Sequence, residues 1–129
     1  MEDKFLSVKD LHVHYLTSDA DVYAVNGISF DLQRGKTLGL VGETGAGKTT
    51  MVRTITGMVK ASSGKVEFNG EDLSGKSSRV ILDSGIVQVP EGRQLFTEMT
   101  VLENLELGAF NKETKAHFAE NLEKCYNWL

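Results

Sequence analysis

The chain has 129 residues and a formal net charge of −4, with 40% hydrophobic and 25% charged residues. This length and composition favour one globular domain with its own core. An acidic chain without a dense Lys/Arg cluster lacks the basic patch of most nucleic-acid binders, so we expect no nucleic-acid partner. No apolar run reaches the roughly 18 residues of a membrane helix, and the acidic start of the chain is unlike a secretory signal. The single cysteine, Cys125, indicates a reducing, cytosolic setting, and we predict that it is a packing residue.

Two stretches of alternating apolar and polar residues open the chain and predict strands. They cover residues 5–16 and 22–32, and a tight turn follows at residues 33–36. His12 and His14 would lie on one face of the first strand. Two such histidines can bind a metal, but no third ligand is visible in the sequence, and we expect a solvated strand face instead.

A glycine-rich loop follows these strands and is the most informative stretch of the chain. Residues 42–49, Gly-Glu-Thr-Gly-Ala-Gly-Lys-Thr, match the phosphate-binding pattern G-x-x-x-x-G-K-[ST]. Residues 37–41 predict a buried strand before the loop, and residues 50–56 predict a helix after it that ends near Gly57. In such a loop the backbone N–H groups face an anion, Lys48 reaches the β- and γ-phosphates, and the Thr49 hydroxyl ligates Mg²⁺. The predicted nucleotide-binding residues are Gly42, Glu43, Thr44, Gly45, Ala46, Gly47, Lys48, Thr49 and Thr50.

The remaining sequence predicts one more short strand, a buried strand and two helices. Residues 65–70 alternate and stop at Asn-Gly, which is typical of a strand followed by a turn, and residues 85–90 predict a buried strand. Between them, Gly75 and the Ser77-Ser78 pair weaken any helix over residues 73–84. A capping box at residues 100–103 opens a helix. Residues 113–129 predict an amphipathic helix with an apolar face of Phe118, Leu122, Cys125 and Leu129.

From about Phe5 to its C-terminus the chain resembles the ATPase subunits of ABC transporters. The resemblance is carried by the opening strands before the phosphate loop, by residues 63–70, and by residues 89–105, which begin Val-Pro-Glu-Gly-Arg. It implies an α/β fold: a P-loop NTPase core with an N-terminal antiparallel β subdomain and a truncated helical subdomain. Residues 1–129 would then form a partial ABC transporter ATPase domain.

The resemblance also implies cofactors, partners and further site residues. The cofactors are ATP and Mg²⁺. Tyr15 occupies the position of an aromatic residue that stacks on adenine, and Glu91 stands where most members carry a glutamine that helps to ligate Mg²⁺, so Thr49 and Glu91 are the predicted metal ligands. Implied partners are a transporter membrane subunit and another ATPase subunit in a homo- or heterodimer. The implied location is cytoplasmic, peripheral to the inner face of the cell membrane.

The transported solute and the catalytic activity stay open. Residues 89–105 are most similar to branched-chain amino acid importers, whereas residues 42–50 are more similar to peptide importers. The family's Leu-Ser-Gly-Gly-Gln signature and its acidic strand are absent from the sequence; residues 80–83, Val-Ile-Leu-Asp, are a poor candidate for that strand. His117 lies too early to be the family's switch histidine, and we expect it to face solvent. We assign no catalytic residue and expect this chain to bind ATP without hydrolysing it efficiently alone.

Two other functions are compatible with a phosphate loop. A small P-loop enzyme, such as a nucleotide kinase or a GTPase, is the first. Residues 111–114 give only Asn-Lys of the guanine-reading Asn-Lys-x-Asp, and four arginines are few for a kinase lid. The second is a nucleotide-binding module without catalysis that self-associates through its C-terminal helix.

Overall fold

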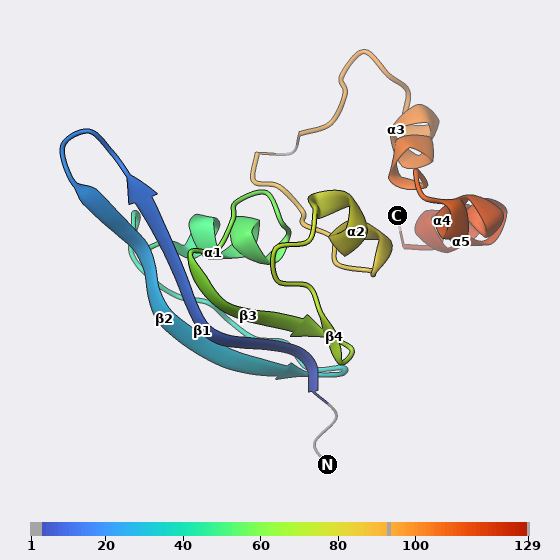
Figure 1. Ribbon diagram of the computed structural model, residues 1–129. Helices are drawn as coiled ribbons and strands as arrows, with labels where there is room; N and C mark the ends of the chain where they lie inside the picture. The colour runs from blue at the N-terminus through green and yellow to red at the C-terminus, as the bar shows by residue number, and fades with distance from the viewer. Residues whose placement is uncertain (1–3, 93, 129) are drawn as a thin grey trace. The chain divides into compact units, whose positions relative to one another are not determined.

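The computed structural model describes residues 4–92 and 94–128 (Figure 1). Five residues lie outside the described ranges: Met1, Glu2, Asp3, Arg93 and Leu129. Arg93 belongs to the Val-Pro-Glu-Gly-Arg segment, and Leu129 belongs to the apolar face predicted for the C-terminal helix. The chain folds as two compact units, one ending at Gln88 and the other beginning at Val89.

An antiparallel sheet forms the body of the first unit (Figure 1). Its strands are β1 (Lys4–Leu16), β2 (Asp21–Gln33), β3 (Ser63–Phe68) and β4 (Glu71–Asp72), in the order β2-β1-β3-β4. All three strand pairs are antiparallel, which confirms the predicted antiparallel opening of the chain. The turn between β3 and β4 uses Asn69 and Gly70 at φ values of 49° and 80°, the positive values that an Asn-Gly hairpin turn requires.

Helix α1 (Lys48–Ile55) lies over one face of this sheet (Figure 1). Met51 and Ile55 from the helix are buried against apolar residues of β1, β2 and β3, namely Val8, Leu11, Val13, Val25 and Val66. Burying a side chain of this size stabilises the fold by about 1.5–3 kcal/mol. The helix ends at Ile55, and Gly57 follows at a φ of 75°, as the sequence predicted.

Helix α2 (Ser78–Asp83) occupies a segment for which the sequence favoured no helix. The Ser77 side chain accepts a hydrogen bond from the Val80 N–H and so caps the first turn. Ile81 is 2% exposed and packs with Phe68 and Leu73 in a second cluster. Residues 80–83 are therefore helical, which excludes them as the acidic strand.

Two predicted buried strands, one before the phosphate loop and one at the end of the first unit, are wrong. Residues 37–41 and 85–90 do not form strands, and Val41 and Val87 are 96% and 71% exposed. A strand needs a hydrogen-bonded neighbour, and in the described part of the chain neither segment is paired with another strand. Local apolar character alone does not supply that neighbour.

The second unit contains three helices among its described residues: α3 (Val101–Gly108), α4 (Lys112–Ala116) and α5 (Phe118–Tyr126). The capping box that opens α3 is confirmed, because the side chains of Thr100 and Glu103 each bond the other's backbone N–H. The predicted single helix over residues 113–129 is wrong in its continuity, since His117 at φ −110° and ψ 19° separates α4 from α5. Within the described residues, no helix is long and apolar enough to span a membrane.

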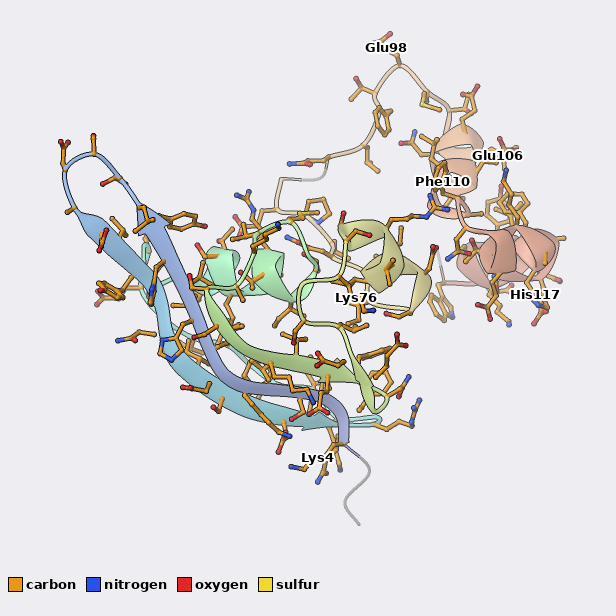
Figure 2. All side chains as sticks on the ribbon, viewed as in Figure 1. Lys4, Lys76, Glu98, Glu106, Phe110 and His117 are labelled. Atoms are coloured by element: carbon orange, nitrogen blue, oxygen red, sulfur yellow. The ribbon has the colours of Figure 1, made fainter. Side chains whose placement is uncertain are left out.

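The side chains of this unit agree with two predictions. Phe118, Leu122 and Cys125 are half-buried on one side of α5, so Cys125 packs as expected. His117 is 63% exposed at the junction of α4 and α5, where Figure 2 shows it. It therefore faces solvent, as the sequence predicted.

Candidate functional site

The phosphate-loop residues lie between the turn after β2 and the start of α1. Gly47 is the N-terminal flanking residue of α1, and its carbonyl accepts the first helical hydrogen bond from the Met51 N–H at 2.8 Å. Among the described residues, no side chain caps this end of the helix. The helix N-terminus therefore carries unpaired N–H groups and a partial positive charge, which together favour an anion.

The backbone of Gly47 lies directly against β2. A Cβ atom built on Gly47, whose φ is 79°, would lie 2.0 Å from the carbonyl oxygen of Ala24. Only a residue without a side chain allows this approach, since ordinary contact begins at 3.4 Å. The second invariant glycine of the motif thus fixes the position of the loop on the sheet.

Lys48 folds back over the loop that precedes it. Its Nζ donates hydrogen bonds to the carbonyl oxygens of Gly42 and Glu43, the second at 2.7 Å. The Ala46 N–H donates to the Glu43 carbonyl at 3.1 Å and so closes a turn within the loop. The ammonium group is therefore held above the loop by acceptors that phosphate oxygens can replace, and this donor set fits a polyphosphate.

Side chains that complete the predicted loop site are accessible. Thr49, in the first turn of α1, is exposed, and Thr50 beside it is half-buried. Glu43, Thr44 and Gly45 are exposed on the loop. A hydroxyl at Thr49 is the hard oxygen donor that Mg²⁺ prefers.

Tyr15 lies on the same pair of strands that supports the loop. It is 40% exposed and is the register partner of Val22 across β1 and β2. Gly47 contacts Ala24, which is two residues after Val22 on β2. Two residues span about 7 Å along a strand. The sheet therefore brings the predicted base-stacking residue and the phosphate loop to one end of β2.

Glu91 belongs to the second unit, whereas the loop belongs to the first. Glu91 is exposed in a turn with Gly92. Gln88, three residues before Glu91, ends the first unit. The side-chain oxygen of Gln88 accepts a hydrogen bond from the Thr56 hydroxyl at 3.2 Å. No sequence pattern indicates this bond, because it joins the end of α1 to a segment 32 residues later.

His12 and His14 lie on one face of β1 but are not fully solvated. Their rings are 5.8 Å apart, and the ring of His14 packs on Tyr23 at 4.3 Å. His12 Nε2 lies 3.0 Å from an Asp10 carboxylate oxygen. Both residues are half-buried by these contacts, which corrects the predicted solvated face. The part of the chain that the structure describes holds no group of three or more His, Cys, Asp or Glu side chains suited to a metal ion.

Known proteins with similar sequences are ATP-binding proteins of transport systems. The family model described as ABC transporter matches residues 25–128. The high-affinity branched-chain amino acid transport ATP-binding protein BraG of Pseudomonas aeruginosa is 39% identical over 89 residues, which are 69% of this chain and 38% of that protein. The oligopeptide transport ATP-binding protein OppF of Bacillus subtilis is 47% identical over 79 residues, which are 61% of this chain and 26% of that protein.

Solved structures agree with this relationship. A nucleotide-free ATP-binding cassette from an ABC transporter is 32% identical and superposes with a TM-score of 0.73 over 84% of this chain and 42% of that one. A dimeric cassette bound to ADP and Pi is 20% identical, and its TM-score of 0.71 over 92% of this chain and 56% of that one supports the fold alone. These neighbours confirm the predicted P-loop NTPase fold class with its antiparallel β part.

The extent of the similarity defines what the chain represents. It spans 38% and 26% of the lengths of the two curated relatives given above, so it corresponds to part of an ATP-binding module. The family match begins inside β2, runs through α5 and covers well over half of the sequence. The chain therefore belongs to the ABC transporter family.

Proposed function

We propose that residues 1–129 are a partial ATPase domain of an import-type ABC transporter and that they hold Mg-ATP on residues 42–50. The observation that carries the proposal is the position of Lys48, whose ammonium group is held over the loop at the N-terminus of α1. On binding, Lys48 exchanges two carbonyl acceptors for β- and γ-phosphate oxygens, and charge-assisted bonds of this kind are stronger than those to neutral acceptors.

The other loop residues have separate roles in this proposal. The uncapped N–H groups of α1 bind phosphate oxygens, and the Thr49 hydroxyl is a metal ligand. Glu91 belongs to the other unit, so its predicted role as a metal ligand stays a prediction. Mg²⁺, when bound, neutralises negative charge on the phosphates.

Tyr15 binds the base by stacking, which is tolerant of base identity because every base has a π-face. We therefore expect only a weak preference for adenine, with GTP bound within about tenfold of ATP, or ~1.4 kcal/mol. Competition binding of ATP and GTP to the 129-residue chain tests this. A strong preference for guanine contradicts the proposal and favours the GTPase alternative.

The proposed partners follow from the relatives. We propose a transporter membrane subunit and a second ATPase subunit as partners. The proposed location is cytoplasmic, peripheral to the inner face of the cell membrane. The similarity to BraG and to OppF supports an amino acid or a peptide as the imported solute.

Thermal unfolding with and without Mg-ATP tests the site. A ligand that binds only the folded state stabilises it by about 2.7 kcal/mol at a concentration of 100 times Kd. Lys48→Ala should remove most of this stabilisation. Lys36→Ala, which removes an exposed lysine from the turn region after β2, is the matched control and should retain it. An undiminished ATP effect in Lys48→Ala would show that the phosphates bind elsewhere.

A further inference from the structure

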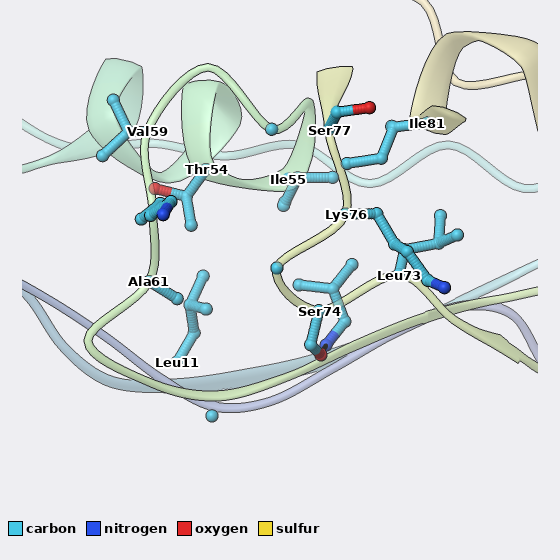
Figure 3. A pocket seen from close by; sticks show the side chains of 15 residues that line it. Leu11, Thr54, Ile55, Val59, Ala61, Leu73, Ser74, Lys76, Ser77 and Ile81 are labelled. Carbon is cyan, nitrogen blue, oxygen red and sulfur yellow. Dashed lines mark hydrogen bonds between the residues drawn. The ribbon is translucent and has the colours of Figure 1, made fainter. Parts of the chain in front are cut away.

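A cavity of about 220 Å³ lies beside α1 in the first unit (Figure 3). Its walls come from α1, from β1 and β3, and from the segment that joins β4 to α2. In Figure 3, Thr54, Val59 and Ala61 lie on one side of the open centre, and Leu73, Lys76 and Ile81 lie on the other. None of these residues belongs to the phosphate loop, so the cavity is separate from the proposed nucleotide site.

Most of the cavity wall is apolar and belongs to the core. The side chains of Leu11, Leu73 and Ile81 are at most 2% exposed, and those of Ile55 and Val66 are at most 7% exposed. This wall favours the apolar part of a ligand, because contact with it removes apolar surface from water.

The polar side chains around the cavity offer positive charge and hydrogen-bond donors. Lys60, after α1, and Lys76, before α2, both line it. Ser77 accepts a hydrogen bond from the Val80 N–H at 3.4 Å, and its own hydroxyl proton is available to donate. No Asp or Glu occurs among the described residues that line the cavity.

Asp72 precedes the lining residue Leu73 in the sequence but is not among the lining residues. The Ser74 N–H donates to Asp72 at 2.9 Å, and Lys65 Nζ lies 3.8 Å from its other oxygen. Hydrogen bonds from Ser74, with smaller effects of Lys65 and Lys76, hold the pKa of Asp72 below its ordinary value of 3.8. Asp72 is thus held mainly by Ser74, and the attraction of Lys76 to it is a smaller effect.

The size and the chemistry together define one ligand class. A volume of 220 Å³ is below the roughly 300–1,000 Å³ of pockets for drug-sized molecules, so the ligand is small. An apolar wall with cationic and donor groups at its edge suits an anion with an apolar body. A ligand ammonium group would face two lysines without a lining carboxylate. We propose that this cavity binds a short aliphatic monocarboxylate that carries no amino group.

Amide spectra of the 15N-labelled 129-residue chain, titrated with 4-methylpentanoate, test the proposal. We expect saturable shifts at amides around the cavity, such as those of Ile55 and Ser77, with Kd on the order of 1 mM for so small a ligand. Leucine has the same carbon skeleton with an added ammonium group, and 4-methylpentan-1-ol lacks the charge. Both should bind at least about tenfold more weakly, since charge-assisted bonds are worth about this much or more. Equal binding of leucine or of the alcohol, or shifts unrelated to the cavity, would overturn the proposal.

Two sets of variants separate the apolar wall from the charged edge. The double variant Lys60→Ala/Lys76→Ala should weaken 4-methylpentanoate binding at least about tenfold, whereas Lys36→Ala should not change it. Ala61→Trp places a large ring at an exposed lining position and should block the cavity. If this variant does not fold, the lysine pair still decides the question. Unchanged affinity in the lysine pair refutes the proposed role of these charges.

The proposal is independent of nucleotide binding. Lys48→Ala, which should abolish the effect of Mg-ATP, should bind 4-methylpentanoate with unchanged affinity. Inorganic phosphate, an anion without an apolar body, should not shift the cavity amides at the same concentration. If phosphate shifts them as strongly as the carboxylate, the site recognises charge alone and the proposed ligand class is wrong.

Discussion

Replacing Gly47 by alanine should destabilise the first unit more than the same change at Gly45. Both glycines have positive φ, 79° and 85°, so alanine costs about 1–2 kcal/mol of backbone strain at either position. At Gly45 the new Cβ would have no atom of the described residues within 4 Å. At Gly47 it would lie 2.0 Å from the Ala24 carbonyl oxygen, so the start of α1 and β2 must separate by well over an ångström. Such overpacking costs about 1–3 kcal/mol more.

We therefore expect losses in the free energy of unfolding of about 2–5 kcal/mol for Gly47→Ala and about 1–2 kcal/mol for Gly45→Ala. Urea unfolding in the absence of nucleotide, followed by far-UV circular dichroism, measures both. Fluorescence is a poorer probe, because the only tryptophan, Trp128, belongs to the second unit and is 86% exposed. Losses that agree within about 0.5 kcal/mol would refute the inferred contact between the loop and β2.

Three further predictions concern acid stability, helix capping and catalysis. Hydrogen bonds from Lys4 and Ser7 hold the pKa of Asp31 below 3.8. The stability that Asp31 contributes is therefore present above that pH and is lost as the pH falls through the lower folded-state pKa. Asp31→Asn should lower the urea midpoint at pH 6 but not in strong acid, and an equal decrease at both pH values would contradict this. Thr100→Ala should cost α3 about 1 kcal/mol and speed exchange of the Glu103 amide about fivefold, whereas Glu103→Gln, which keeps an acceptor, should have the smaller effect. The 129-residue chain alone should release no phosphate from ATP above background, because losing even one transition-state donor lowers the rate of hydrolysis by about 10²–10³. Steady hydrolysis that disappears in Lys48→Ala would overturn this.

Features set by neighbouring residues in the chain were predictable from sequence. The glycine loop, the alternation in β1 and β2, the Asn-Gly turn and the box at Thr100 each depend on residues within a few positions of one another. Their physical causes are local: permitted backbone angles, side-chain alternation and capping bonds. The structure confirms the predicted strands, the Asn-Gly turn and the capping box, whereas phosphate binding by the glycine loop stays a prediction.

Features that depend on distant residues were missed or wrongly predicted. Residues 37–41 have the composition of a buried strand, but no strand among the described residues pairs with them. Ser77 looked like a helix breaker, yet it caps α2, because serine favours the position before a helix over positions inside one. Two further features join segments that no short sequence pattern connects. Gly47 contacts Ala24, and Lys60 and Lys76 line one cavity.

The exposed apolar segment before the phosphate loop has a consequence for the behaviour of the chain in solution. Residues 37–41 are uncharged, and Leu38, Leu40 and Val41 are 49%, 43% and 96% exposed. An uncharged segment with exposed β-branched or aliphatic side chains, which pairs with no strand of the described chain, can pair with the same segment of another molecule. Solubility of the isolated chain should therefore fall steeply with concentration, and a charged residue at Val41, where the side chain meets only solvent, should raise it.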